Sequence, residues 1–123
     1  MSESILIVED DRELAAALVD ALRAAGMARP VVVCDGVEAL TWLHSHSPRV
    51  VLLDLHLPRA DGEEIWSYMQ ADDDLRDVPT IVITGAADPA LAHFQGVSEI
   101  LRKPVPLERL VAAIKRVLPA SPA

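Results

Sequence analysis

Residues 5–11 read Ile5-Leu6-Ile7-Val8-Glu9-Asp10-Asp11, a short apolar run rich in β-branched residues that stops at three acids. A run of this length and composition predicts a buried β-strand. The next segment, residues 12–25, repeats leucine and alanine at helical spacing and stops at Gly26, which predicts an amphipathic helix. The beginning of the chain therefore predicts a strand, an acidic turn and a helix.

The same alternation continues to the end of the chain. Further apolar runs predict strands at residues 31–34, 50–53, 80–83 and 97–101, and the segments between and after them predict helices at residues 37–45, 63–71, 88–96 and 106–118. Strands that are apolar throughout are covered by helices on both faces. The pattern predicts an α/β fold, a doubly wound five-stranded parallel sheet flanked by helices.

The sequence leaves the order of the strands open. The fifth run is interrupted by Ser98 and Glu99, which favours a position at the edge of the sheet. The second run is apolar throughout, which indicates a central or well-covered strand.

Length and charge narrow the classes of protein. The 123 residues predict one domain spanning 1–123, with a core at about 4–118, a tail at 119–123 and no effector domain after Leu118. A net charge of -8 disfavours direct nucleic-acid binding. The acidic surplus suits a divalent cation, a basic partner or simply solubility.

The sequence also predicts the location of the protein. No apolar stretch is long enough for a membrane span, and the start lacks signal-peptide features. The single Cys34 cannot form an internal disulfide, so we expect a cytoplasmic protein.

Chemistry-bearing residues follow four of the predicted strands. They are Glu9, Asp10 and Asp11 after the first, Asp54 after the third, Thr84 after the fourth and Lys103 after the fifth. The carboxyl ends of parallel strands meet in one binding crevice. Carboxylates that lie close together repel one another unless a positive charge separates them, and carboxylate oxygens suit Mg²⁺. The ammonium of Lys103 could hold a phosphate oxygen.

Each of these residues also has a structural explanation. Asp10 or Asp11 could cap the following helix, and Asp54 or Thr84 could belong to an ordinary turn. Lys103 could be a solvated surface charge. The convergence of all of them at one end of the sheet favours a site.

The ordered set of motifs resembles the receiver domain of bacterial two-component response regulators, of the single-domain, chemotaxis-regulator-like kind. The resemblance is carried by residues 5–11, Asp54-Leu55-His56-Leu57-Pro58 with Asp61-Gly62, Ile83-Thr84 and Lys103-Pro104, and it covers essentially the whole chain. It implies a flavodoxin-like fold and an aspartate that accepts a phosphoryl group.

The resemblance assigns a role to each position. It implies that Asp54 is the phospho-acceptor and that Glu9, Asp10, Asp54 and the main-chain carbonyl of His56 hold Mg²⁺, Glu9 through water. It also implies that Thr84 and Lys103 contact the phosphoryl group. Glu9, Asp10 and Asp54 sum to -3, which Mg²⁺ and Lys103 would bring to zero. Asp11 is then left to cap the helix.

The implied function is a phosphorylation-dependent switch in a two-component phosphorelay, with no separate turnover substrate. Its partners would be a histidine kinase or a histidine phosphotransfer protein, and an unidentified downstream protein. The chain would be a monomer or a phosphorylation-dependent dimer. Two alternatives stay open, a receiver-like adaptor that phosphorylation does not regulate and an aspartyl-phosphate phosphatase. The phosphatase is disfavoured because His56 stands where such enzymes have a second acid.

Three features depart from the family or add to it. Ile100 stands where an aromatic switch residue is common, and the segment from Thr84 to Lys103 is about one helical turn short, so the usual output surface is in doubt. His56 is hypothesised to tune the lifetime of the phosphoryl group, the alternative being a solvated loop residue. Equal dephosphorylation rates of wild type and His56→Ala over about pH 5.5–8, where imidazole titrates, would contradict that hypothesis.

Overall fold

The structure, a computed structural model, describes residues 4–27, 29–57, 59–85 and 94–118. In these ranges the strands are β1 (Ile5–Val8), β2 (Pro30–Val33), β3 (Val50–Asp54), β4 (Thr80–Thr84) and β5 (Glu99–Arg102). The helices are α1 (Arg12–Ala24), α2 (Gly36–Ser45), α3 (Gly62–Ala71) and α4 (Leu107–Val117). The helix predicted at residues 88–96 falls largely outside the described residues.

The strands form one parallel sheet in the order β2-β1-β3-β4-β5. In this register Asp54 at the end of β3 lies level with Ile83 of β4, and Thr84 lies level with Arg102 of β5. The carboxyl ends of neighbouring strands are therefore in line at one edge of the sheet. The predicted fold class is confirmed.

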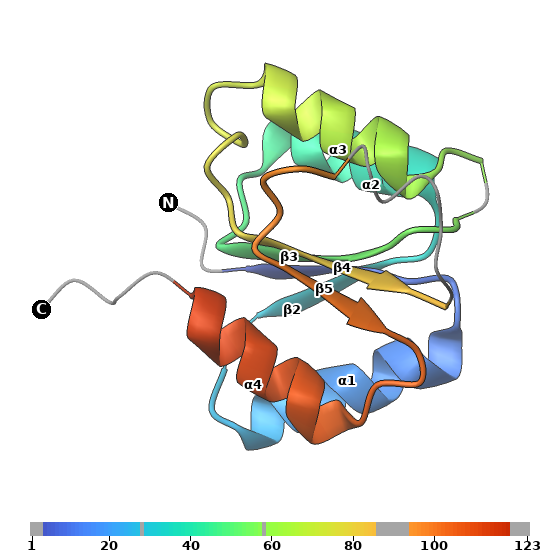
Figure 1. The fold of residues 1–123 in the computed structure, drawn as a ribbon, viewed down its shortest axis with the longest axis vertical. Helices are drawn as coiled ribbons and strands as arrows, with labels where there is room; N and C mark the ends of the chain where they lie inside the picture. Colours follow the sequence, from blue (N-terminus) through green and yellow to red (C-terminus); the bar gives the residue numbers. More distant parts are fainter. Residues whose placement is uncertain (1–3, 28, 58, 86–93, 119–123) are drawn as a thin grey trace, which may run out of the picture.

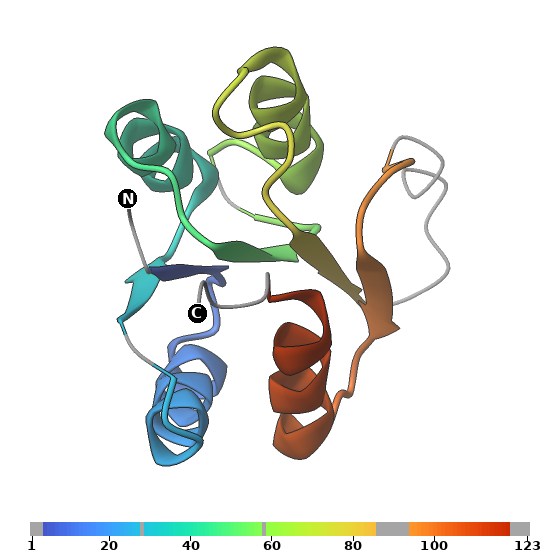
Figure 2. The same ribbon diagram turned by 90° about the vertical axis from the view of Figure 1, so that its left-hand side faces the viewer.

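Helices cover both faces of the sheet. Helices α1 and α4 lie on one face and α2 and α3 on the other (Figure 1). The turned view shows the same three layers, with the sheet between the two helix pairs (Figure 2). In the described part of the chain, no helix has the length and apolar character needed to cross a bilayer.

The core consists of two clusters, one on each face of the sheet, because successive side chains of a strand point to opposite faces. From β1, Leu6 and Val8 join the cluster under α2 and α3, while Ile5 and Ile7 join the cluster under α1 and α4. All four are at most 2% exposed. The central strands are thus buried on both faces, as their uninterrupted apolar runs predict.

Of the two positions expected for the second strand, central or well covered, the central one is wrong, because β2 lies at the edge and pairs with β1. Its faces are nonetheless covered, with Val31 packing on one cluster and Val32 on the other. An apolar run reports how well the faces of a strand are covered, and it does not report how many strands lie beside it.

The fifth strand lies at the opposite edge, as its polar residues predict. Its bounds differ from the predicted 97–101, since β5 begins at Glu99. Val97 packs against the core, and the Ser98 N–H donates to the Thr80 carbonyl at 2.9 Å. The predicted strand began too early because Val97 is apolar for packing against the core, although it precedes the first residue of β5.

Candidate functional site

The residues predicted to form a site lie at the carboxyl edge of the sheet. Glu9 directly follows β1, Asp54 ends β3, Thr84 ends β4 and Lys103 directly follows β5. Three of these side chains are buried, with 4% of Glu9, 6% of Asp54 and 1% of Thr84 exposed. Buried acids at a strand end are unusual unless they are paired or bind a ligand.

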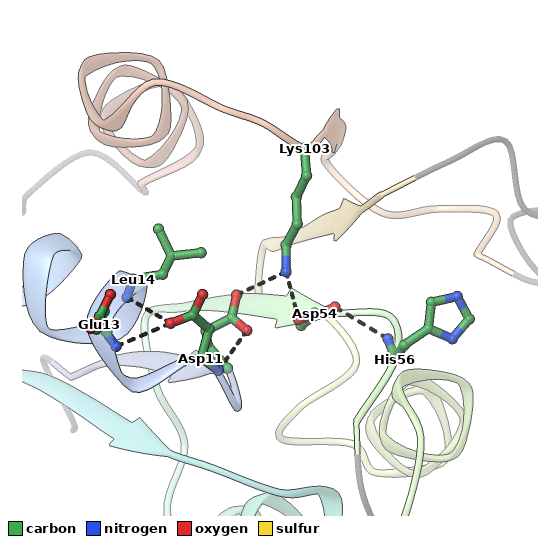
Figure 3. A network of polar contacts seen from close by, with 7 residues as sticks. Asp11, Glu13, Leu14, Asp54, His56 and Lys103 are labelled. Atoms are coloured by element: carbon green, nitrogen blue, oxygen red, sulfur yellow. Dashed lines mark hydrogen bonds and ion pairs between the residues drawn. The ribbon is translucent and has the colours of Figure 1, made fainter.

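Lys103 joins two of the acids. Its Nζ lies 2.9 Å from Oδ2 of Asp54 and 3.3 Å from Oε1 of Glu9. Figure 3 shows the lysine side chain reaching from the end of β5 to Asp54. The Lys103 N–H also donates to the Thr84 carbonyl at 2.7 Å, which ties β5 to β4 directly behind the site. The structure thus brings together residues 9, 54 and 103 from three different strands.

The remaining carboxylate oxygens of these two acids accept main-chain N–H groups. Oδ1 of Asp54 accepts from the His56 N–H at 3.2 Å, and Oε2 of Glu9 accepts from the Asp11 N–H at 3.1 Å. Each acid is therefore oriented by its own chain on one side and by Lys103 on the other. Asp54 is held in a defined position with one oxygen directed toward the lysine (Figure 3).

Asp10 completes an acidic cluster. Glu9, Asp10 and Asp54 each offer a carboxylate oxygen, and these oxygens all lie within 4.8 Å of one another. Asp10 is exposed, whereas the other two are buried, so the cluster opens to solvent on one side. A small cation could reach these oxygens from that side.

Burial and neighbouring charges shift the pKa values of Glu9 and Lys103. Burial, followed by the hydrogen bond and charge of Asp54, raises the pKa of Glu9 from 4.5 to about 7, against the opposing effects of the Asp11 N–H and Lys103. Burial alone would lower the pKa of Lys103, but its hydrogen bond to Asp54 and the charges of Asp54 and Glu9 raise it above 10.5. Lys103 is therefore a permanent cation near neutral pH, and Glu9 is close to its titration point.

This donor set fits Mg²⁺. Three carboxylates face one ammonium, which leaves two negative charges uncompensated when all three acids are ionised. The hydrogen bond and charge of Asp54 add to burial in raising the pKa of Glu9, so a bound cation would favour the ionised form of Glu9. Magnesium is bound in proteins by one or two carboxylates and retains several waters, which suits a cluster with one open side.

Two neighbouring residues can be placed as well. Asp11 caps α1, since its Oδ1 accepts from the N–H groups of Glu13 and Leu14 at 3.1 and 3.2 Å, and this confirms the assignment made from the sequence. The His56 side chain is exposed and directed away from Asp54 (Figure 3). Its effect on phosphoryl lifetime stays a prediction.

Ile100 lies on β5 with 43% of its surface exposed. The position at which the family commonly has an aromatic is thus occupied by an aliphatic side chain on the outer surface. An isoleucine has no aromatic ring that could move from the surface of β5 to a buried position, so Ile100 cannot act as an aromatic switch residue.

The sequence did not point to the contact of Gly36 with Ala60, two residues before Gly62, which packs against the Asp54 main chain. Gly36 begins α2 and is buried against the main chain of Ala60. A glycine at the first turn of a helix gives no indication of which distant segment packs on it.

Comparison with known proteins identifies the class. Residues 5–115 match the model of the response regulator receiver domain. A curated relative, the polar-differentiation response regulator DivK of Brucella anthropi, is 31% identical over 121 residues, covering 96% of this chain and 98% of the relative.

Solved structures agree with the relatives. The signal receiver domain of a signal transduction histidine kinase from Syntrophus aciditrophicus has a TM-score of 0.84 at 29% identity, covering 95% of this chain and 90% of that one. The receiver domain of sensor histidine kinase PA1611 from Pseudomonas aeruginosa, with a magnesium ion in its active site cleft, has a TM-score of 0.83 at 28% identity, covering 95% and 98%. The chain belongs to the response regulator receiver domain family.

Proposed function

We propose that this chain is a phosphorylation-dependent signalling switch in which Asp54 accepts the phosphoryl group. The observation that carries the proposal is the position of Asp54, a buried carboxylate 2.9 Å from the Lys103 ammonium and within 4.8 Å of oxygens from two further acids. Such a carboxylate is a nucleophile next to charges that can neutralise a phosphoryl group.

The residues proposed to hold Mg²⁺ are Glu9, Asp10, Asp54 and the main-chain carbonyl of His56, Glu9 through a water. The magnesium-bound receiver domain among the similar structures and the acidic cluster of this chain both support this choice. When bound, Mg²⁺ would neutralise negative charge on the transferring phosphoryl oxygens.

In the proposed transfer, a carboxylate oxygen of Asp54 attacks the phosphorus of a phosphohistidine. An O–P bond forms, the N–P bond breaks, and the imidazole of the donor leaves with the electron pair of that bond. Lys103 already lies beside Asp54 and would move its hydrogen bonds to a phosphoryl oxygen. Water later cleaves the acyl phosphate and restores the carboxylate.

Thr84 is the proposed sensor of the modification. Its side chain is buried at the end of β4, the strand next to Asp54. A hydroxyl hydrogen bond to a charged group is worth about 1.5–3 kcal/mol. That energy shifts a two-state equilibrium by roughly 10- to 150-fold, which is sufficient for a switch without refolding.

The remaining parts of the proposal concern the bounds of the domain, its partners, its oligomeric state and its location in the cell. We place the receiver domain at about residues 4–118, with a histidine kinase or histidine phosphotransfer protein as phosphodonor and protein contacts as output, either as a monomer or as a phosphorylation-dependent dimer. Membership of the family supports kinase or phosphotransfer partners. No separate turnover substrate is proposed. The free, half-buried Cys34 suits the reducing cytoplasm.

The test is incubation with acetyl phosphate and Mg²⁺, followed by intact mass measurement. We expect one phosphoryl adduct that is labile in acid and in base, and that neither Asp54→Asn nor EDTA-treated protein acquires. Asp20→Asn, the same change at an exposed aspartate of α1, is the matched control and should label like wild type.

Two results would contradict the proposal. Undiminished labelling of Asp54→Asn would move the acceptor elsewhere. Absence of any adduct on folded wild type, with Mg²⁺ and with a phosphohistidine donor as well, would favour the unphosphorylated adaptor instead.

A further inference from the structure

The first turn of α2 is packed against the chain that follows Asp54. Gly36, the first residue of α2, is buried, and a Cβ built on it would lie 1.7 Å from the carbonyl oxygen of Ala60 and 2.4 Å from its carbonyl carbon. Real Cβ atoms essentially never approach another atom within 3.0 Å. Any side chain at position 36 would therefore displace the main chain at Ala60 or lift α2 away from it.

The residue before Gly36 contacts the same segment. Oδ1 of Asp35 accepts from the Glu38 N–H at 2.8 Å and caps α2, while Oδ2 pairs with the Arg59 guanidinium at 3.1 Å. Arg59 has a φ of 72°, in the left-handed region that favours glycine. One carboxylate thus links the start of α2 to a residue whose backbone conformation needs support from its surroundings.

Residues 59–62 are in turn packed on the phospho-acceptor strand. The Gly62 N–H donates to the Leu55 carbonyl at 3.1 Å, and a Cβ on Gly62 would lie 2.9 Å from the Asp54 carbonyl oxygen. Leu55 is 2% exposed and precedes His56, whose N–H bonds Oδ1 of Asp54. A displacement of Ala60 would therefore move Gly62, and the close contacts of Gly62 with the main chain of residues 54 and 55 would shift Asp54 and the main chain of His56.

We propose that Asp35 and Gly36 are positioning residues for the metal and phospho-acceptor site. They hold residues 59–62 against Asp54 and Leu55, and so set the place of the His56 main-chain carbonyl relative to the Asp54 carboxylate. The inference rests on the function proposed above, because it assigns that carbonyl as a cation ligand. Residues that orient ligands from behind typically alter metal affinity 10- to 100-fold when they are changed, as an order of magnitude.

The test is titration of the unphosphorylated protein with MgCl₂, by calorimetry and by ¹H–¹⁵N NMR. Gly36→Ala is expected to weaken Mg²⁺ binding by about 10-fold or more. The Leu57 amide shares its peptide bond with the His56 carbonyl, so its Mg²⁺-induced shift should shrink in the variant. A role limited to stability would leave both readouts unchanged in the folded fraction.

Two control variants isolate the contact. Val37→Ala changes the next residue of α2, which is 37% exposed, and should bind Mg²⁺ like wild type. Leu22→Ala weakens the core on the opposite face of the sheet, and should lower stability while leaving Mg²⁺ affinity within about twofold. Loss of affinity in Leu22→Ala equal to that in Gly36→Ala would overturn the proposal.

A third variant covers the case in which Gly36→Ala does not fold. Asp35→Asn keeps an N-cap oxygen and removes the charge that faces Arg59, and should weaken Mg²⁺ binding about two- to fivefold. Wild-type affinity in both folded variants, or in Asp35→Asn alone if the other is unfolded, would overturn the inference and leave the proposed function intact. Failure of wild type itself to bind Mg²⁺ would instead contradict the proposed function.

Discussion

Glu9 combines two properties that oppose each other. Its carboxylate is nearly fully buried beside Asp54, which raises its pKa to about 7, and a cation in the cluster needs it ionised. A carboxylate with a raised pKa in the folded state favours folding below its unfolded pKa of 4.5 and loses that contribution as pH rises toward 7. Stability of the metal-free protein and affinity for Mg²⁺ should therefore change with pH in opposite directions.

We predict that Mg²⁺ affinity rises about 25-fold between about pH 5.5 and 7.5, because one proton must leave Glu9. The apparent affinity should level off above the pKa of about 7. Calorimetric titrations at several pH values measure this dependence. Glu9→Gln should bind more weakly and with a much flatter pH profile, and a variant that keeps the wild-type slope would show that another group takes up the proton.

Lys103 is the counter-charge for two buried acids. Lys103→Met should lower the free energy of unfolding of the metal-free protein by about 1–3 kcal/mol at pH 8, since it leaves Glu9 and Asp54 unpaired. The value is below that of a fully buried pair because the lysine side chain is 32% exposed and water screens it. Urea denaturation in EDTA measures the loss.

The same loss should be smaller at pH 5, where Glu9 is protonated and only Asp54 needs the lysine. The Lys103 ammonium itself stays charged over this interval, because its pKa is raised. An equal loss at both pH values would show that the lysine acts through its aliphatic packing rather than through its charge.

At the level of elements, α1 begins directly at the site. Asp11 caps the helix through Oδ1, and its own N–H orients Glu9. The three acids between β1 and α1 thus have two roles: Glu9 and Asp10 belong to the acidic cluster, and Asp11 caps the helix. A cap at this place fixes where the helix starts and how the preceding acids are presented.

Asp11→Ala should therefore destabilise the protein by about 1 kcal/mol, the usual cost of losing a side-chain N-cap. Chemical denaturation followed by circular dichroism measures the change. Asp11→Asn, which keeps the acceptor oxygen, should stay close to wild type. Equal destabilisation by both variants would assign the effect to the negative charge near the helix start rather than to the hydrogen bonds.

The strand at the opposite end of the sheet from β5 has a protected edge. The N–H groups of Ile5 and Glu9 donate to the carbonyls of Arg29 and Val33, so alternate residues of β2 direct their backbone groups toward β1. Pro30 lies in the other set and has no N–H to offer a further strand. Proline at an edge is one of the ways in which proteins prevent uncontrolled sheet extension.

In the whole molecule, the two core clusters share the central strands. Leu18 of α1 packs in the cluster on one face, while Trp66 packs in the cluster on the other and Trp42 packs against it. Strands β1, β3 and β4 contribute side chains to both clusters. Neither cluster can therefore stay folded when the other unfolds, because both need the same strands. Unfolding should therefore be a single transition, as is usual for a domain of this size.

We predict that Leu18→Ala lowers the free energy of unfolding by about 2–5 kcal/mol, the usual cost of such a cavity. The loss should be the same by tryptophan fluorescence, which reports the far face, and by circular dichroism, which reports all helices. A fluorescence transition that stays at the wild-type denaturant concentration would show that the two faces unfold separately.

The sequence alone determined the class of fold and the grouping of Glu9, Asp54 and Lys103 at one edge of the sheet. Residues 5–8, 50–53 and 81–83 are apolar without interruption, and strands of that kind are buried on both faces of a parallel sheet. Once the strands are parallel, the residues that follow them must meet at one edge, which is why Glu9, Asp54 and Lys103 could be grouped before any distance was known.

Only the tertiary structure decided the edge position of β2, the bridge from Lys103 to both acids, the raised pKa of Glu9 and the contact of Gly36 with Ala60. Local sequence patterns record which faces of an element are covered, because burial selects the residue type at each position. They do not show which distant segment packs on that face. The distances, the pKa shifts and the close backbone contacts of the site all depend on which segments pack together.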